Sequence, residues 1–351
     1  MILTIFIFVA ILVILILIHE FGHFIVAKLC GVKVREFAFG FPPRILSKVK
    51  NGTRYSLNLI PLGGYVSLLG EDEAVKEEGS YYSAKIWQKI LIVGTGVVMN
   101  FLLGIIVIAI GFTIGMTPLV SDPATLSGTK TSQVMIVEVV SDSAAAKVGL
   151  EAGDILDGFS SPNDLQQFTK KNAGTSVTLN IEKNNRKEAR TVTLAQSDAP
   201  LGVGVVSITK VRQPFLKALV TATIETGKSI GAVFDALWTI IKSVFTTGSA
   251  GETGQAVVGP VGIFNFTSEA LKIGWIYILQ LLAILSINLA IINILPFPAL
   301  DGGKIFFLAL EGIFRKKVIR QEIENLIHTI GFAILIILIL AITFRDIIRL
   351  H

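Results

Sequence analysis

Long apolar runs, separated by polar stretches, dominate the pattern of this chain. Each of the four longest runs is close to the ~20 residues that a helix needs to cross the hydrocarbon core of a bilayer. We therefore expect four transmembrane helices, at about residues 2–27, 90–116, 273–295 and 327–344. A further stretch, 213–245, has apolar residues at helical spacing but carries several charged side chains. This combination favours an amphipathic helix at the outer membrane surface.

The loop between the first two spans alternates apolar and polar residues, as half-buried β-strands do. Asn51-Gly52 separates two such runs, and an Asn-Gly pair between strands is typical of a tight hairpin turn. The pattern predicts a membrane-associated β-hairpin region with strands at 32–39, 44–50 and 53–60, followed by an acidic loop at 71–79.

A small α+β domain is predicted between the second and third spans. Its expected elements are a strand at 133–140, helices at 143–148 and 162–171, and a hairpin of 177–182 with 189–194 around Asn184-Asn185. The expected fold class is therefore a mainly α polytopic membrane protein with a β-hairpin region and an inserted α+β domain. The predicted divisions are an N-terminal membrane part, the inserted domain, an amphipathic helix with its linker and a C-terminal membrane part, at 1–119, 120–208, 209–272 and 273–351.

Composition excludes a soluble globular enzyme, because 52% of the residues are hydrophobic and only 16% are charged. The Lys and Arg residues lie beside the apolar runs and form no basic stripe, which argues for the lipid bilayer and against nucleic acid as a partner. Nine of them fall in 30–89 and five in 301–326, so the positive-inside rule puts both loops in the cytoplasm. Both termini and the inserted domain are then extracytoplasmic.

The motif His-Glu-Phe-Gly-His at 19–23 lies inside an almost uninterrupted apolar run, whose first 18 residues carry no charged side chain. On a helix, His19 and His23 lie on one face and supply half of a tetrahedral zinc site. Glu20 is placed to act on the water that such a zinc ion activates. Ionisable groups are costly inside a membrane, so we interpret the motif as a metal site, in preference to a chance match with satisfied core histidines.

A catalytic zinc ion needs a third protein ligand, and it has to come from elsewhere in the chain. Residues 26 and 29 are Val and Leu, where a metzincin helix would require Gly and His. Asp301 follows Asn-Ile-Leu-Pro-Phe-Pro-Ala-Leu at 293–300, where two prolines break the third span at the predicted depth of His19. Irregular backbone at that depth is tolerated where it is buried in protein or lines a cavity. From spacing and depth, Asp301 is either the third ligand or an interfacial cap after a helix end.

These motifs together resemble the site-2 protease family of intramembrane zinc metalloproteases, and in particular its bacterial RseP-like branch. The resemblance covers nearly the whole chain and rests on HEFGH in the first span, on the N-x-x-P-x-P-x-L-D-G motif at 293–302 and on a single PDZ-like insertion. It departs from the family at 94–100, which lacks the proline that often precedes the second-span Asn. It implies one zinc ion per chain, held by His19, His23 and Asp301, with Glu20 as the general base.

The resemblance also implies an activity: regulated intramembrane proteolysis of single-span proteins in a bacterial plasma membrane, with the active site toward the cytoplasm. Anti-sigma factors or remnant signal peptides would be the substrates, and a site-1 protease would act upstream. An idle scaffold and a transporter are the other classes considered. The intact Glu20 argues against the scaffold, and the lack of an evident internal repeat argues against the transporter.

Substrate contacts are predicted at three places. The resemblance implies that Asn293 holds the substrate backbone, although a polar helix–helix contact is the alternative. We hypothesise that residues 54–66, with Gly63, Gly64 and Tyr65, hold an unwound substrate by β-augmentation. In the PDZ-like domain, the candidate carboxylate loop is Leu201-Gly202-Val203-Gly204. That domain would either recruit substrates or exclude those with bulky extracytoplasmic parts.

Overall fold

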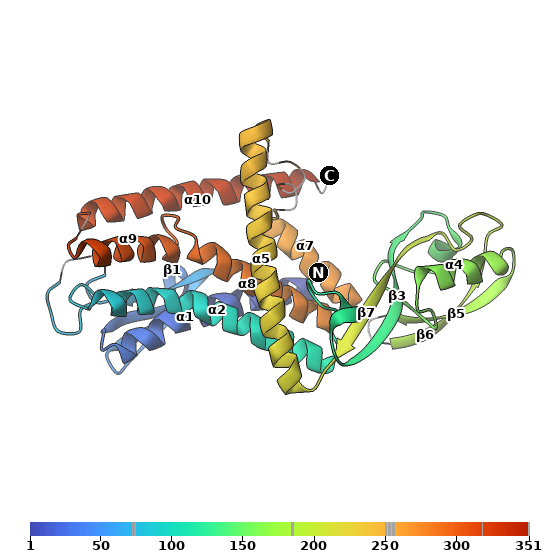
Figure 1. Cartoon of the computed structure of the whole chain (residues 1–351), viewed down its shortest axis with the longest axis horizontal. Coiled ribbons are helices and arrows are strands. Elements are labelled where there is room, and N and C mark those ends of the chain that lie inside the picture. Colours follow the sequence, from blue (N-terminus) through green and yellow to red (C-terminus); the bar gives the residue numbers. More distant parts are fainter. Residues whose placement is uncertain are drawn as a thin grey trace. The chain divides into compact units, whose positions relative to one another are not determined.

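The computed structural model describes every residue except 72, 74, 184, 185, 250, 252, 253, 255, 256, 318, 350 and 351. The chain folds into two compact units. The first comprises Met1–Ile105, Ser229–Asn265 and Leu282–His351, and the second comprises Ile106–Lys228 and Phe266–Leu281. Figure 1 labels most elements of the two units.

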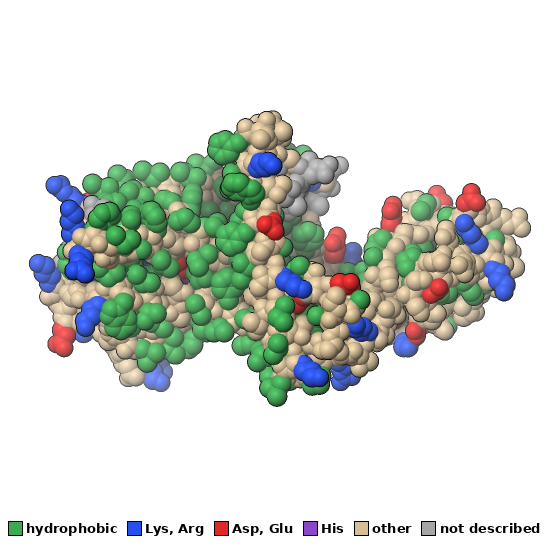
Figure 2. Space-filling model, viewed as in Figure 1, with side chains coloured by type: hydrophobic (Ala, Val, Ile, Leu, Met, Phe, Trp, Pro, Cys, Tyr) green, Lys and Arg blue, Asp and Glu red, His purple; other side chains and the backbone are tan. Residues whose placement is uncertain are grey.

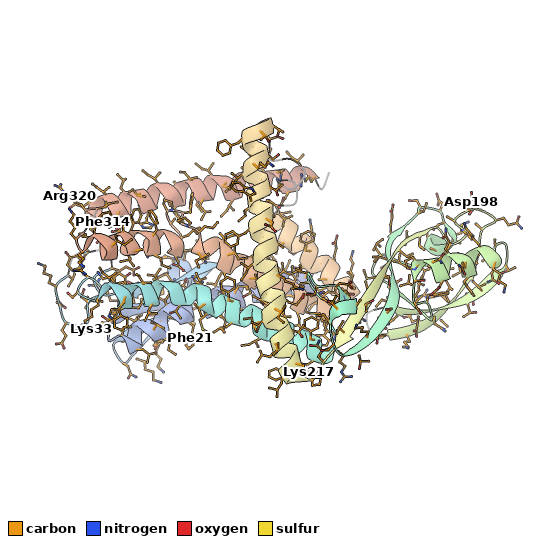
Figure 3. All side chains as sticks on the ribbon, viewed as in Figure 1. Phe21, Lys33, Asp198, Lys217, Phe314 and Arg320 are labelled. Atoms are coloured by element: carbon orange, nitrogen blue, oxygen red, sulfur yellow. The ribbon has the colours of Figure 1, made fainter. Side chains whose placement is uncertain are left out.

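The first unit is mainly helical. It contains α1 (Ile2–Leu29), most of α2 (Ile86–Ile114), the second half of α8 (Trp275–Ile294), α9 (Asp301–Phe314) and α10 (Gln321–Arg349). Hydrophobic side chains cover most of the visible face of these helices, as expected for helices in contact with lipid (Figure 2). Lys33, which follows α1, and Arg320, which precedes α10, lie at the same end of this unit (Figure 3). The two loops predicted to be cytoplasmic therefore meet at one end.

Small residues let the helices of the first unit approach closely. A Cβ at Gly22 of α1 would lie 2.7 Å from the Thr95 carbonyl oxygen of α2. Likewise, a Cβ at Gly104 of α2 would lie 2.8 Å from the side chain of Ile287 in α8. Transmembrane helices associate through such close packing, since lipid gives them no hydrophobic incentive to meet. The consequence is a fixed arrangement of α1, α2 and α8.

Five of the described helices are long and apolar enough to cross a membrane, namely α1, α2, α8, α10 and α5 (Phe215–Thr247). Four of them coincide with the predicted spans, with ends that differ by up to about two turns. The fifth, α5, is the stretch predicted to lie at the membrane surface, and that placement stays a prediction.

The predicted hairpin is present in the first unit as β1 (Val34–Lys50) and β2 (Thr53–Leu68). Its turn is confirmed at Asn51 and Gly52, whose φ angles of 50° and 75° are those of a type I′ turn. Both strands are long and bend. As a result, Glu36–Phe39 of β1 are partnered on one side by Arg54–Leu57 and on the other by Gly64–Ser67.

This folding of the hairpin leaves one strand segment at an edge. Within the described residues, Gly64–Leu68 pairs with β1 on one side and with no other strand on its second side. The backbone of Gly64–Leu68 therefore offers a free edge to a further strand.

The second unit contains a five-stranded antiparallel sheet with the order β6-β5-β4-β3-β7. The strands are β3 (Thr129–Val139), β4 (Ile155–Asp157), β5 (Ser176–Lys183), β6 (Arg186–Thr193) and β7 (Val203–Arg212). Two helices, α3 (Ala144–Lys147) and α4 (Pro162–Lys171), and a short 3-10 turn at Pro123–Thr125 accompany them. The predicted strands and helices of 133–194 are thus confirmed, while the predicted turn residues Asn184 and Asn185 lie outside the described part.

Apolar side chains from both helices and the sheet fill one core in the second unit. It includes Val134, Ile136, Ala145, Leu156, Leu165, Leu179, Ile181 and Val192. The first half of α5 and the last part of α7 (Pro260–Ile273) also belong to this unit. Glu225 of α5 is fully buried, and its carboxylate accepts hydrogen bonds from the backbone amides of Leu119, Val120 and Ser121 at 2.9–3.2 Å. The Glu225 carboxylate, one of the charges that counted against α5 as a span, is therefore stabilised by backbone donors.

Candidate metal centre

The two histidines of the predicted motif lie one turn apart on α1, in the first unit. Their Nε2 atoms are 3.1 Å from each other. His19 is buried, with 8% of its surface exposed. The helical spacing therefore brings both rings to one point, as the sequence predicted.

The break after α8 delivers Asp301 to the same point. α8 ends at Ile294 and α9 begins at Asp301. Ala299 has a left-handed φ of 78°, and its amide donates a hydrogen bond of 3.0 Å to Nδ1 of His328 on α10. Oδ2 of Asp301 then lies 3.1 Å from Nε2 of His19 and 3.4 Å from Nε2 of His23.

The three donor atoms fit one zinc ion. With zinc–ligand bonds of about 2.0–2.1 Å, two ligand atoms of a tetrahedron are about 3.3–3.4 Å apart, close to the separations of 3.1, 3.1 and 3.4 Å here. Oδ2 of Asp301 is also buried and makes no hydrogen bond to any described residue. A buried carboxylate oxygen in this situation needs a cation.

Hydrogen bonds at Nδ1 determine which ring nitrogens are available. Nδ1 of His23 lies 2.8 Å from the carbonyl oxygen of Ile92 in α2. A carbonyl only accepts, so Nδ1 carries the proton and Nε2 keeps its lone pair for a metal.

Asn100 of α2 has the corresponding role for His19. It is fully buried, and its amide group lies 3.3 Å from Nδ1 of His19. The amide nitrogen faces the ring, and Oδ1 has no partner among the described residues. Rotation of the amide group by 180° lets Oδ1 accept a hydrogen bond from Nδ1–H of His19. Both histidines then present Nε2 lone pairs to the same point.

A glycine on α2 makes room for the centre. A Cβ at Gly96 would lie 2.4 Å from Nε2 of His23 and 2.8 Å from Cε1 of His19. Gly96, the Ile92 carbonyl and His328 belong to no motif that predicts them as site residues. The sequence signal for Gly96 is its spacing of four residues from Asn100, which places both on one face of α2.

A cavity of about 350 Å³ opens beside the three ligand candidates. Of the residues predicted for function, Glu20, Asn293, Gly64 and Tyr65 are on its wall. Gly63 is not among the described lining residues. It lies against the ring of Phe41, where a Cβ would be 2.6 Å from Cε2. The first unit thus brings the metal ligands, the candidate base and one edge of β2 together.

The candidate carboxylate loop lies in the second unit. Leu201, Gly202 and Val203 line a cavity of about 420 Å³ together with residues of α4 and Val205 of β7. β7 is the last strand of the sheet order. Val211 near its end bridges to Met116, which leaves the start of β7 at an edge among the described residues. Gly204, also predicted, is not on the described wall and packs beside Glu138.

The fold and the site define a class: a protein with helices that can cross a membrane, which carry a candidate metal centre. The model of peptidase family M50 matches residues 7–338, and the chain belongs to this family of site-2 proteases. It is a multi-pass zinc metalloprotease.

Several relatives align with this chain over almost its full length. A Clostridium perfringens protein with the name "Putative zinc metalloprotease" is 35% identical over 340 residues, which is 95% of each chain. The zinc metalloprotease RasP of Oceanobacillus iheyensis is 28% identical over 429 aligned positions, covering 96% of this chain and 97% of that protein. RasP of Bacillus licheniformis is 27% identical over 437 aligned positions and covers 99% of each.

Proposed function

We propose that this protein is an intramembrane endopeptidase that cuts the membrane span of single-span proteins near the cytoplasmic side of a bacterial plasma membrane. One observation carries the proposal. Three metal-ligand atoms converge at the end of an apolar helix, in the same cavity as a free strand edge. Such an edge offers backbone partners to an extended polypeptide beside the metal centre.

Each residue of the centre has a chemical role in this proposal. His19, His23 and Asp301 hold the zinc ion, which, when bound, polarises the scissile carbonyl and lowers the pKa of water to about 7. Glu20 is next to His19 and lines the same cavity. Its carboxylate takes a proton from water and passes it to the leaving nitrogen.

The substrate is held as a β-strand. A transmembrane helix hides its peptide bonds in internal hydrogen bonds, so the helix has to unwind before hydrolysis. The edge at Gly64–Leu68 supplies new backbone partners by β-augmentation. A Cβ at Gly64 would lie 3.1 Å from Cγ of Glu20, so a peptide on this edge passes close to the base. Asn293 is on the cavity wall, and an N–H of its side chain donates a hydrogen bond to a carbonyl of the peptide backbone.

The second unit works as a PDZ-like domain outside the cytoplasm. The cavity between α4 and the start of β7 supports this proposal, because PDZ domains bind peptide C-termini beside a strand edge. Deleting residues 120–208 distinguishes its two roles. Loss of a filter broadens cleavage to substrates with bulky extracytoplasmic parts, and loss of a recruiter reduces cleavage of the normal substrates.

The two basic loops at one end of the first unit support a cytoplasmic location of that end, with both termini on the other side. His19 is near the end of α1 that precedes Lys33, so the metal centre lies toward the cytoplasm. Single-span proteins reach a metal centre at this depth. The substrates we propose are anti-sigma factors that a site-1 protease has already shortened, and remnant signal peptides.

The test is Glu20→Gln in the purified, detergent-solubilised protein. Cleavage of a single-span substrate stops, while one zinc ion per chain is retained. Glu77→Gln, which changes an exposed loop carboxylate, is the matched control and leaves cleavage intact. Unchanged cleavage in Glu20→Gln would contradict the proposal. A search for membrane peptides that accumulate in cells with Glu20→Gln identifies the natural substrates.

A further inference from the structure

An ion pair connects the two walls of the metal cavity. Nζ of Lys304 donates to Oε1 of Glu71 at 2.7 Å. Lys304 is one turn after Asp301 on α9, and Glu71 follows the end of β2 at Leu68 by three residues. The pair therefore joins the helix that begins with a metal ligand to the strand that offers the free edge.

Both ends of this connection are firmly held. Beyond β2, the amide of Leu69 donates to the carbonyl of Lys33 at 2.9 Å, and the amide of Tyr81 donates to the carbonyl of Leu69 at 2.7 Å. At the start of α9, a Cβ at Gly302 would lie 2.2 Å from the carbonyl oxygens of Ile294 and Leu295, so that turn is tightly packed. The Lys304–Glu71 pair thus links two firmly packed segments.

The ion pair also forms a partition. Glu71 and Lys304 line the metal cavity and, at the same time, a smaller polar cavity of about 70 Å³. The Glu71 carboxylate raises the pKa of Lys304 above its ordinary value, so the ammonium group stays charged. The pair therefore lies between the two cavities, on the wall that it shares with Gly64–Val66 of β2 and with Asp301.

We propose that Lys304 and Glu71 are positioning residues: their ion pair sets the separation between the free edge of β2 and the metal ligand Asp301. This inference rests on the proposed function, because it concerns where the bound peptide lies relative to the metal and to Glu20. A peptide on the edge of β2 is bound by the strand, but it reacts only if α9 is held at the correct distance. Small displacements of a bound substrate reduce the rate strongly.

Lys304→Met and Glu71→Gln test the inference with a single-span substrate in detergent. We expect kcat to fall about tenfold or more in each variant, with KM changed less than about threefold, because the strand edge stays intact while the alignment is lost. The double variant is no slower than either single variant, since both remove the same contact. Lys304→Arg keeps the charge and restores a large part of kcat. Zinc remains at one ion per chain throughout.

Lys187→Met is the matched control. It breaks a pair of the same length, 2.7 Å to Asp157, that is exposed in the second unit, and it leaves kcat and KM unchanged. If Lys304→Met loses zinc, the variant Glu71→Gln decides, because it leaves α9 untouched. Additive losses of kcat in the double variant, or an unchanged kcat in Glu71→Gln, would overturn the positioning role of the Lys304–Glu71 pair. In that case the proposed function still stands if the wild type cleaves the substrate and Glu20→Gln does not. If the wild type does not cleave the substrate, the proposed function itself is refuted.

Discussion

Nδ1 of His23 on α1 donates a hydrogen bond of 2.8 Å to the carbonyl oxygen of Ile92 on α2. In a regular α-helix the Ile92 carbonyl accepts a hydrogen bond from the backbone N–H of Gly96, four residues later. Here it also accepts one from the His23 ring of another helix. The bond determines the tautomer of His23 and ties the orientation of a metal ligand to the packing of α1 against α2. Zinc affinity should therefore depend on α2, which contributes no ligand of its own to the three candidates.

Gly96→Ala is the most direct test of this dependence. The added Cβ would lie 2.4 Å from Nε2 of His23, so the ring has to leave its position or the helices have to separate. We expect the loss of stoichiometric zinc and a fall in cleavage of at least about 100-fold. Metal analysis of the purified protein measures the first effect. Gly94→Ala is the control, because the nearest atom to its Cβ is 3.7 Å away, and full zinc loss there would contradict a local cause.

Two variants of Asn100 test whether this residue orients His19 or only packs between the helices. Asn100→Leu removes every hydrogen-bonding group from Nδ1 of His19, and we expect zinc affinity to fall about 10–100-fold, as is typical when the partner of a metal-bound histidine is lost. Asn100→Asp keeps an acceptor oxygen and should retain most of the affinity. Competition with a zinc chelator measures both variants. Equal affinities in the two variants would show that Asn100 does not accept a hydrogen bond from Nδ1–H of His19.

Removal of the metal and removal of the third ligand should both stop cleavage, but only the first should be reversed by added zinc. A chelator abolishes cleavage and added zinc restores it in the wild type, because the three donors of the centre are otherwise intact. Asp301→Ala leaves two ligands, so added zinc should not restore activity. Elemental analysis and a cleavage assay check both statements. Wild-type turnover by Asp301→Ala would exclude Asp301 as a ligand.

The spans, the hairpin and the two metal motifs could be predicted because each is a local pattern. The type I′ turn at Asn51 and Gly52 needs only two residues with positive φ, and His19 and His23 meet because a helix repeats every 3.6 residues. The spacing of residues alone did not decide whether Asp301 is the third ligand or an interfacial cap. The family resemblance was needed to favour the ligand role.

Contacts between distant segments could not be predicted in the same way. Lys304 and Glu71 are separated by 233 positions, and no local pattern pairs them. The close approach of Gly96 to the histidine rings depends on how α1 and α2 cross. The charge of Glu225 looked unfavourable for a span because its three backbone donors, at 119–121, precede it by more than 100 residues.

Proline substitutions along the free edge test whether substrates bind there as a strand. A proline at Tyr65, Val66 or Ser67 removes one backbone N–H, so at least one of two neighbouring positions should lose a hydrogen bond to the added strand. We expect cleavage to fall about tenfold or more at the positions whose amides point away from β1, with zinc still at one ion per chain. Tyr65→Ala, which leaves the amide in place, separates the backbone from the side chain, and Glu73→Pro in the acidic loop controls for proline itself. Full cleavage by all three proline variants would mean that the peptide is held elsewhere in the cavity.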